Sequence, residues 1–405
     1  MMVARSHKAD EVHAVLPIGE FDFGADAPTW LAHCAEGPVP RASMRAVEQV
    51  HLKELRPWLV QWEEDLLGLP ARARLAGARL LGVSVDQVSL VPNTSTGLIT
   101  VARGLERRTD GEVLTPLGEF PANHWPWRAA GWPIREVPLW DGHRAGTQAE
   151  RSTSPQAGVT PERALLDAIG PNTQVMAVSW VRFQDGLRLD LRALADGCAA
   201  RGVLLVVDGI QGAGTLPLDL NGVGAFCTGG HKGLLAPAGL GLLWVNPAVR
   251  DVIQPPGSWF GVEDAANFDR ANTDYHREHL LTGERYEYGV PSLLGCAGLA
   301  PSLELLAKHG VAQIAAHIAL LQGRLLAGLR GGPWGAEAAR LQGLLGEGRL
   351  GSILALRSPA AQEWVTRGVG AGIAVTAREG YLRVAFHGWH AESDVIRALR
   401  WMHQT

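Results

Sequence analysis

Lysine is scarce in this chain. Lys8, Lys53, Lys232 and Lys308 are the only four, so arginine supplies 33 of the 37 basic residues. Where any cation would serve, the chain uses arginine. A retained lysine therefore points to what a primary amine offers, a pKa that burial can lower and a nucleophilic nitrogen. Lys232 stands in TGGHKGLLAPAGLG (228–241), among glycines and apolar residues, where an ordinary loop lysine is the alternative interpretation.

Cysteine, basic runs and long apolar runs are also scarce. The four cysteines, at positions 34, 198, 227 and 296, have no C-x-x-C spacing, which indicates reduced thiols rather than disulfides or zinc ligands. A formal net charge of −4 without a basic block gives no support for nucleic-acid binding. No uninterrupted apolar run is long enough to span a bilayer, and the first twenty residues lack a signal-peptide core. We therefore expect a cytoplasmic protein with no nucleic-acid or membrane partner.

Short apolar runs alternate with helix-like segments between about residues 65 and 250, which predicts an α/β domain with a mostly parallel sheet. Helix-like and short strand-like segments after residue 297 predict a smaller α+β domain. The expected organisation is an N-terminal segment (1–60) packing with the small domain, a large domain (61–290) and the small domain (291–405). The predicted strands of the large domain are 88–91, 112–115, 174–181, 202–209, 225–230 and 239–245, and residues 189–202 are a predicted crossover helix.

Two predicted neighbouring strands end in groups of opposite charge. GVLLVVDG (202–209) delivers Asp208 to its carboxyl end, and Lys232 follows AFCTGG (225–230). Ligand sites in parallel sheets lie at such ends. PNTSTG (92–97) adds hydroxyl groups at a helix start near Thr96, a pattern suited to phosphate. A buried Asp–Lys ion pair and a simple helix N-cap are the alternative interpretations.

These three features together match one cofactor, pyridoxal 5′-phosphate (PLP). It has a phosphate, a ring nitrogen that pairs with a carboxylate and an aldehyde that condenses with an amine. VVDGIQGAGTLPLDLNGVGAFCTGGHKGLLAPAGLGLLWV resembles the signature of class V aminotransferases, which include cysteine desulfurases, kynureninases and isopenicillin N epimerase-like proteins. The resemblance covers about residues 60–390 and implies the fold of PLP-dependent transferases, aspartate aminotransferase-like and of fold type I.

The resemblance also implies roles for individual residues. By it, Lys232 forms the Schiff base with PLP, Asp208 pairs with the pyridine nitrogen and Gln211 hydrogen-bonds the ring 3′-oxygen. His231 resembles the residue on the phosphate side, and Thr94 and Ser95 match the hydroxyl-bearing phosphate loop.

Three further segments carry the resemblance. EFPANHWPW (119–127) places Phe120 where a side chain stacks on the cofactor, although core packing would also explain it. VRFQDGLRLDL (181–191) offers Gln184 as a cofactor contact. YLRVAFHGWH (381–390) places Arg383 where an arginine clamps the substrate carboxylate, whereas without the family it would be an ordinary surface charge.

The chain departs from the family in three places. Gly229 stands where a serine or threonine often touches the phosphate. Val290, in RYEYGVPSLLG (285–295), replaces a threonine that reaches the neighbouring subunit's phosphate, although the segment still indicates a homodimer. No cysteine follows Cys296, which argues against a persulfide-forming desulfurase.

We therefore predict a PLP-dependent enzyme that acts on a small-molecule amino-acid substrate through Lys232 and Asp208, most simply an aminotransferase. A β-lyase or epimerase acting on a cysteine-derived or kynurenine-like substrate is the alternative in the same chemistry. A catalytically silent PLP-fold binding protein is the alternative of another class. HREH (276–279) and HGWH (387–390) lack partner carboxylates or cysteines at ligand spacing, so we expect no metal site.

Overall fold

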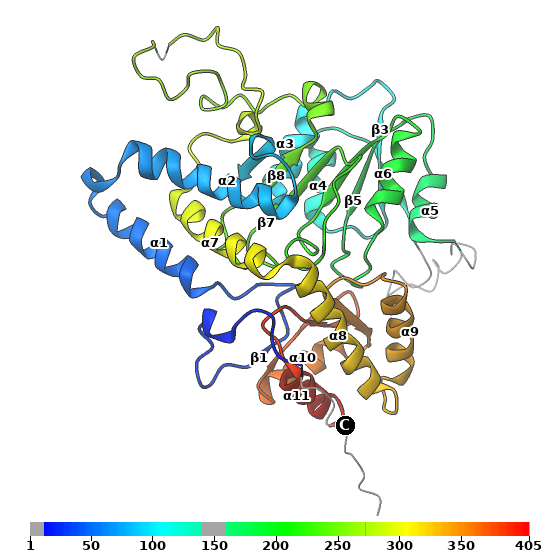
Figure 1. The fold of residues 1–405 in the computed structure, drawn as a ribbon. Helices are drawn as coiled ribbons and strands as arrows, with labels where there is room; N and C mark the ends of the chain where they lie inside the picture. Colours follow the sequence, from blue (N-terminus) through cyan, green and yellow to red (C-terminus); the bar gives the residue numbers. More distant parts are fainter. Residues whose placement is uncertain (1–11, 140–158, 272, 405) are drawn as a thin grey trace, which may run out of the picture.

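A computed structural model of the chain describes residues 12–139, 159–271 and 273–404. Its large domain is built on a seven-stranded sheet with the strand order β2-β8-β7-β6-β5-β3-β4 (Figure 1). Strands β7, β6, β5, β3 and β4 are parallel, and β8 is antiparallel to both neighbours, so the predicted mostly parallel sheet is confirmed. The strands are β2 (Val88–Val91), β3 (Glu112–Pro116), β4 (Ile134–Val137), β5 (Thr173–Ser179), β6 (Leu204–Asp208), β7 (Ala225–Gly229) and β8 (Gly241–Val245).

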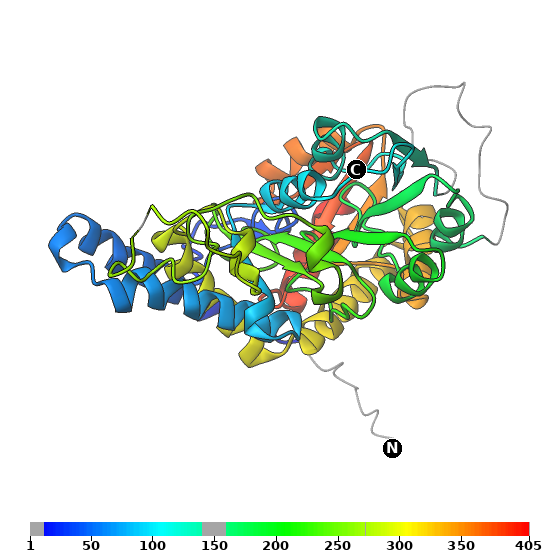
Figure 2. The ribbon, with the colours of Figure 1, turned by 90° about the horizontal axis from the view of Figure 1, so that it is seen from above.

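Helices cover both faces of this sheet, as Figure 2 shows. Along β5, Met176 and Val178 belong to the apolar cluster on one face, and Val175 and Ala177 to the cluster on the other. Alternate residues of a strand point to opposite faces, so a continuous apolar run is what a doubly covered strand needs. The covering helices are α2 (Gly68–Leu81), α5 (Pro161–Asp167), α6 (Leu191–Ala199) and α7 (Leu293–His309) on one face, and α3 (Thr94–Gly104) and α4 (Trp125–Ala129) on the other.

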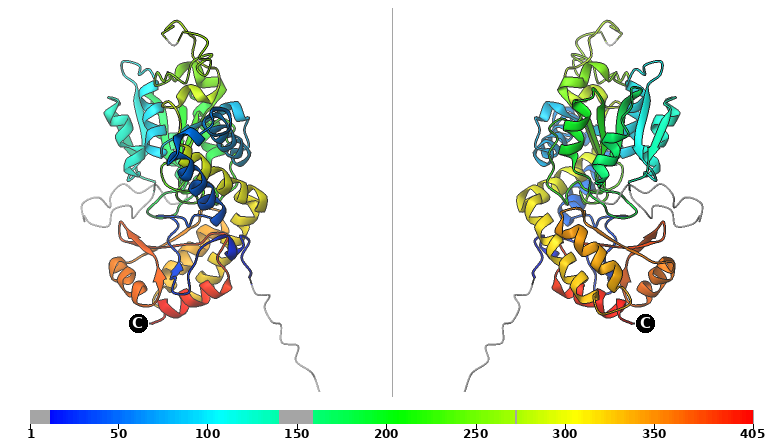
Figure 3. Two further views of the ribbon diagram at one scale, coloured as in Figure 1. Left: turned by 90° about the vertical axis from the view of Figure 1, so that its left-hand side faces the viewer. Right: turned by 90° about the vertical axis from the view of Figure 1, so that its right-hand side faces the viewer.

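The small domain lies below the large one in the views of Figure 3. Its antiparallel sheet has the order β11-β12-β9. The N-terminal segment joins this domain through β1 (Thr29–Trp30), which pairs in parallel with β10 (Ile373–Ala374), while α1 (Arg41–Glu54) packs along α7. The division at residues 60 and 290 stays a prediction. The remaining elements are β9 (Ile353–Arg357), β11 (Thr376–Arg378), β12 (Tyr381–Ala385), α8 (Val311–Leu329), α9 (Gly335–Gly346), α10 (Ala361–Gly370) and α11 (Glu392–Met402).

One helix in the described part of the chain, α8, is long and apolar enough to cross a membrane by length and composition. In the structure it packs against α9 and α11. Ile314, Leu321 and Leu325 on its inner face are fully buried. Because this face fills the core of the small domain, α8 is accounted for as a core helix.

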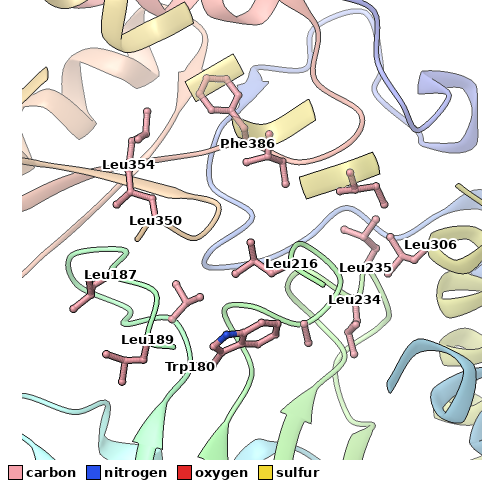
Figure 4. Close-up of a cluster of buried hydrophobic side chains, with 14 of the residues drawn as sticks. Trp180, Leu187, Leu189, Leu216, Leu234, Leu235, Leu306, Leu350, Leu354 and Phe386 are labelled. Atoms are coloured by element: carbon pink, nitrogen blue, oxygen red, sulfur yellow. The ribbon is translucent and has the colours of Figure 1, made fainter. Parts of the chain in front are cut away.

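Apolar side chains of both domains meet beneath the loop that carries Lys232 (Figure 4). Leu234 and Leu235 follow Lys232 and Gly233 and are fully buried. Each such leucine contributes about 2 kcal/mol through the removal of its surface from water. The cluster therefore anchors the lysine loop on both domains. The labelled members are Trp180, Leu187, Leu189, Leu216, Leu234, Leu235, Leu306, Leu350, Leu354 and Phe386.

Candidate functional site

Asp208 ends β6 and is almost completely buried. Its Oδ1 accepts a hydrogen bond from the Ile210 amide at 3.0 Å, whereas its Oδ2 has no partner among the described residues. The pKa of this carboxyl is raised to about 7, mainly by burial. The nearby Glu119 contributes to the rise, and the Ile210 amide and Lys232 oppose it. An unpaired buried carboxyl is costly, so this oxygen is suited to a cationic or hydrogen-bonding ligand.

Lys232 follows the end of β7, which pairs in parallel with β6, so both groups lie at one edge of the sheet. No salt bridge joins Asp208 to Lys232, and the interpretation as a plain ion pair is wrong. The Nζ atom lies 5.7 Å from the centroid of the Phe120 ring. Burial lowers the pKa of Lys232, and Asp208 partly opposes this. A lowered pKa increases the fraction of neutral amine, the form that acts as nucleophile or base.

The hydroxyl-bearing segment forms the first turn of α3. The helix begins at Thr94, not near Thr96 as predicted, because Asn93 caps it by accepting from the Thr96 amide at 2.9 Å. Thr94 does not serve as the cap, and its buried Oγ1 has no partner among the described residues. Ser95 follows in the same turn and is partly buried. A Cβ on Gly97 would lie 2.1 Å from Cys227 Sγ, so glycine is what lets this turn approach β7.

Gly229, at the end of β7, faces the same turn. A Cβ built there would lie 3.2 Å from Thr94 Oγ1 and 3.3 Å from His231 Nδ1. Thr94 and His231 therefore flank one small space that a larger residue at 229 would begin to fill. The same Cβ would also lie 3.0 Å from Ile210 Cδ1, so a serine or threonine, which the family often has at this position, would fit only if these neighbours moved.

The two glutamines are buried and partly hydrogen-bonded. Gln211 Nε2 donates to the Cys34 carbonyl at 3.0 Å, and Gln184 Nε2 donates to the Gly118 carbonyl at 2.8 Å. Gln184 Oε1 has no partner among the described residues. Phe120 is 38% exposed and packs edge-on against Phe183 at 5.1 Å, so the interpretation as core packing is wrong for its ring.

Arg383 lies in β12 of the small domain and is 3% exposed, so it is not an ordinary surface charge. Its Nε donates to Thr376 Oγ1 at 3.0 Å, and its Nη1 donates to the Phe183 carbonyl at 2.7 Å. These bonds fix the plane of the guanidinium next to Phe183, whose ring touches Phe120. A fixed planar fork is suited to a carboxylate.

The structure adds residues that the sequence did not reveal. The carboxylate of Glu119 accepts from the amide of Ser179, at the end of β5 beside Asp208. Cys34, from the N-terminal segment, lies near enough to Lys232 and Arg383 to affect the pKa of both. No local pattern marks Cys34, because long-range contacts bring it here, including the pairing of β1 with β10, the bridge between Ala32 and Ala385 and the bond from Gln211 to the Cys34 carbonyl. Glu119 lies in the segment EFPANHWPW, which the sequence analysis singled out for Phe120. The contact of its carboxylate with Ser179 could not be predicted, because it depends on where β5 ends.

The buried groups are those that PLP would need. Asp208 Oδ2, Thr94 Oγ1 and Gln184 Oε1 are acceptors or donors without partners in the described part of the chain, and the space at Gly229 lies between two groups able to bind phosphate. An amine with a lowered pKa and a buried arginine complete the set. The arrangement fits a phosphate-bearing aldehyde cofactor together with a carboxylate substrate. The histidines of HGWH (387–390) have a structural role, because His387 and His390 hydrogen-bond the backbone carbonyls of Gly233 and Trp30.

The model of one protein family, aminotransferase class-V, matches residues 69–334, more than half of the chain. The chain is 26% identical to an uncharacterized aminotransferase of Bacillus subtilis (strain 168), over 92% of each chain. It is 30% identical to the isopenicillin N epimerase of Streptomyces clavuligerus, over 54% of each. The solved structure of a cystine C-S lyase in complex with its product, cysteine persulfide, superposes with a TM-score of 0.77 at 20% identity, over 93% of this chain and 97% of that one. The predicted fold is thereby confirmed.

Proposed function

The chain belongs to the aminotransferase class-V family, whose cofactor is PLP, and we propose that it transforms an amino acid with Lys232 as the residue that attaches the cofactor. One observation carries the proposal. Asp208 and Lys232, a buried carboxyl with a free oxygen and an amine with a lowered pKa, stand at neighbouring parallel strand ends without forming an ion pair. Two such groups left unpaired in a protein interior indicate that a ligand lies between them.

Each residue of the site has a role in this proposal. Asp208 would hold the ring nitrogen, and Gln211 and Gln184 would contact the ring edge. Thr94, Ser95 and His231 would bind the phosphate, with the α3 N-terminus favouring the anion. Phe120 would cover one face of the ring, and Arg383 would orient the substrate through its carboxylate.

When bound, PLP supplies an electron sink for charge that develops at the substrate α-carbon. Lys232 supplies the rest of the chemistry as a general base, because a lowered pKa increases the fraction of neutral amine that can take the α-proton. Asp208 would hold a proton on the ring nitrogen, because its carboxylate, once paired with that positive charge, stabilises the protonated form of the ring. Arg383 holds the α-carbon in one place relative to Lys232.

Transamination is the reaction we propose first, because the relative that matches along nearly the whole chain is named an aminotransferase. β-Elimination or epimerisation is the second candidate, supported by the names of the epimerase and the C-S lyase. Transamination and epimerisation differ in where the proton returns, and β-elimination differs in losing a group from the β-carbon; Lys232 and Asp208 do not decide between these outcomes. A catalytically silent binding protein is the remaining alternative.

We also propose a homodimer. Trp259, Tyr288 and Val290 lie in the segment before α7 and are 42–53% exposed. Tyr288 donates or accepts a hydrogen bond with Thr100 of α3 at 2.7 Å, so this apolar surface is continuous with the helix of the proposed phosphate site. A second copy would cover it. Cytoplasmic location stays a prediction.

The test uses the purified protein incubated with PLP. We expect a visible absorbance band that Lys232→Ala abolishes and that Lys308→Ala, a distant lysine on α7, leaves unchanged. A colourless wild-type protein would overturn the proposal. Single-turnover mixing with amino acids then separates the reactions. Conversion of the cofactor to pyridoxamine phosphate indicates transamination, release of pyruvate or alanine indicates a lyase, and loss of optical activity indicates epimerisation. A band that no amino acid perturbs would indicate a binding protein.

A further inference from the structure

Four buried histidines, His33, His317, His387 and His390, lie behind the loop that carries Lys232. They come from the N-terminal segment, from α8 and from the segment that follows β12, and none is more than 6% exposed. The His387 ring stacks on Trp389 at 4.7 Å and meets His33 edge-on at 5.2 Å. This set, hereafter the histidine cluster, lies where the N-terminal segment and both domains meet.

The hydrogen bonds of His387 determine its tautomer. The Gly388 amide donates to Nδ1 at 2.7 Å, so Nδ1 carries no hydrogen. The hydrogen is therefore on Nε2, which donates to the Gly233 carbonyl at 3.0 Å. Burial lowers the pKa of His387 to about 3, which keeps the ring in this neutral form. Since Gly233 follows Lys232, the imidazole holds the peptide unit next to the lysine.

The Gly233 carbonyl is confined from the other side as well. A Cβ on Gly214, whose φ is +80°, would lie 2.2 Å from that oxygen, and a Cβ on Gly233 would lie 2.4 Å from the Ala213 carbonyl. The loop is thus pressed against residues 213–214 and closed by His387. Within the loop, the Leu235 amide donates to the Lys232 carbonyl and the Ala236 amide to the Gly230 carbonyl.

His387 is four residues after Arg383 on the same segment, which leaves β12 and turns towards the lysine loop. A single side chain therefore connects the arginine segment of the small domain with the lysine loop of the large domain. Its neighbour Phe386 packs in the interdomain cluster of Figure 4, which fixes the segment on its own side.

We propose that His387 is a positioning residue, whose Nε2–H bond to the Gly233 carbonyl fixes the backbone of Lys232 relative to the segment of Arg383. The bond would thereby fix the distance between the Lys232 amine and the Arg383 guanidinium. That distance has to match the distance between the reacting end and the carboxylate of a bound substrate. The inference deepens the proposed function and rests on it for the roles of Lys232 and Arg383.

The first test needs no cofactor. Hydrogen exchange is measured on the PLP-free protein for peptides that cover residues 230–236. In His387→Leu, which removes the donor, we expect exchange at Leu235 and Ala236 to be faster by roughly tenfold, as follows from losing one buried hydrogen bond. His387→Gln, whose amide can reach the same carbonyl, should return exchange to within about threefold of wild type.

His317→Leu is the matched control. His317 is equally buried in the cluster and bonds the His390 carbonyl at 2.8 Å, but it has no hydrogen bond to the lysine loop. We expect it to lower thermal stability without changing exchange at residues 230–236. If His317→Leu opens this loop as much as His387→Leu, or if His387→Leu leaves it protected, the proposal is wrong. Should His387→Leu not fold, His387→Asn against His387→Gln makes the same comparison, since the shorter amide cannot reach Gly233.

The second test uses the PLP-loaded protein and measures turnover of the amino acid found above. His387→Leu should lower kcat by roughly tenfold, the factor lost in loop protection, and His387→Gln should recover most of it. A wild-type protein that binds no PLP would contradict the proposed function and leave the exchange result standing. A coloured wild type with unchanged kcat in His387→Leu would contradict the positioning role alone.

Discussion

The strand ends around Asp208 and the histidine cluster behind Lys232 are both buried and polar, yet they satisfy their polar atoms differently. Asp208 Oδ2 and Thr94 Oγ1 have no partner among the described residues. Each of the four histidine rings, in contrast, makes at least one hydrogen bond, to a backbone carbonyl or, for His33, to the Ser352 hydroxyl, and of these rings' buried nitrogens only His33 Nδ1 has no partner among the described residues. Burying polar groups without partners costs folding stability, whereas burying polar groups that are hydrogen-bonded makes the surrounding structure more rigid. The first region is built to receive a ligand and the second to hold the first in place.

Asp208→Asn should have the largest effect and should act in opposite directions on activity and stability. A raised folded-state pKa means that stability is lost as pH rises from 3.8 towards 7, so removing the charge should stabilise the PLP-free protein by about 3 kcal/mol near pH 7. Activity should fall by roughly 10²–10³-fold, because an aimed charge is lost from the site. Urea unfolding and steady-state kinetics measure the two effects. A less stable PLP-free variant would mean that Asp208 is structural.

Arg383→Lys tests a group that combines the features of both regions. One bond to the Thr376 hydroxyl and one to the Phe183 carbonyl hold the guanidinium in place, and its remaining N–H groups are available to a ligand. Lysine retains the charge but not the planar fork. We expect KM for the amino acid to rise by roughly 10- to 100-fold with a smaller change in kcat. The absorbance of the bound cofactor should not change. An equal loss of cofactor binding would show that Arg383 supports the fold and not the substrate.

Acid should weaken the histidine cluster selectively. The pKa values of His33, His317, His387 and His390 are all lowered, with burial as the largest cause. Asp394 is the charged group that opposes this at His390. Their stability contribution is complete above about 6.5, the pKa of unfolded histidine, and is lost progressively as pH falls below it. For His387 alone the loss at pH 5 is about 2 kcal/mol.

Urea unfolding of the wild type and of His387→Gln at pH 7 and pH 5 measures this loss. The variant cannot take up the proton, so its stability should fall by about 2 kcal/mol less between the two pH values. An identical fall in both proteins would mean that His387 does not titrate on unfolding.

Gly229→Ser should have the smallest effect. The new side chain would enter the space between Thr94 and His231, where its Cβ is within 3.3 Å of both polar atoms. We expect PLP affinity to fall by roughly threefold to tenfold, about 1 kcal/mol, because the added side chain crowds its neighbours at the phosphate site. Gly19→Ser, at an open surface position, is the control. Unchanged affinity would place the phosphate elsewhere.

The sequence by itself determined the class of fold and the polar ends of its strands. The runs VMAV (175–178) and LLVV (204–207) are apolar at every position because both faces of the sheet are covered, and that pattern predicted β5 and β6. It also placed Asp208 and Lys232 at one edge. Strand β4 (IREV) was missed because its pattern is mixed, and its place at the sheet edge leaves most of it partly exposed.

Only the tertiary structure decided which distant residues complete the site. Cys34 reaches it through the pairing of β1 with β10, Arg383 through β12, and His387 through a bond to Gly233 across more than 150 residues of chain. Such contacts depend on how the two domains pack, and domain packing leaves no periodic mark in the sequence. Local sequence patterns were thus enough to predict Lys232 and Asp208 as site residues, whereas long-range packing determined which residues hold them in place.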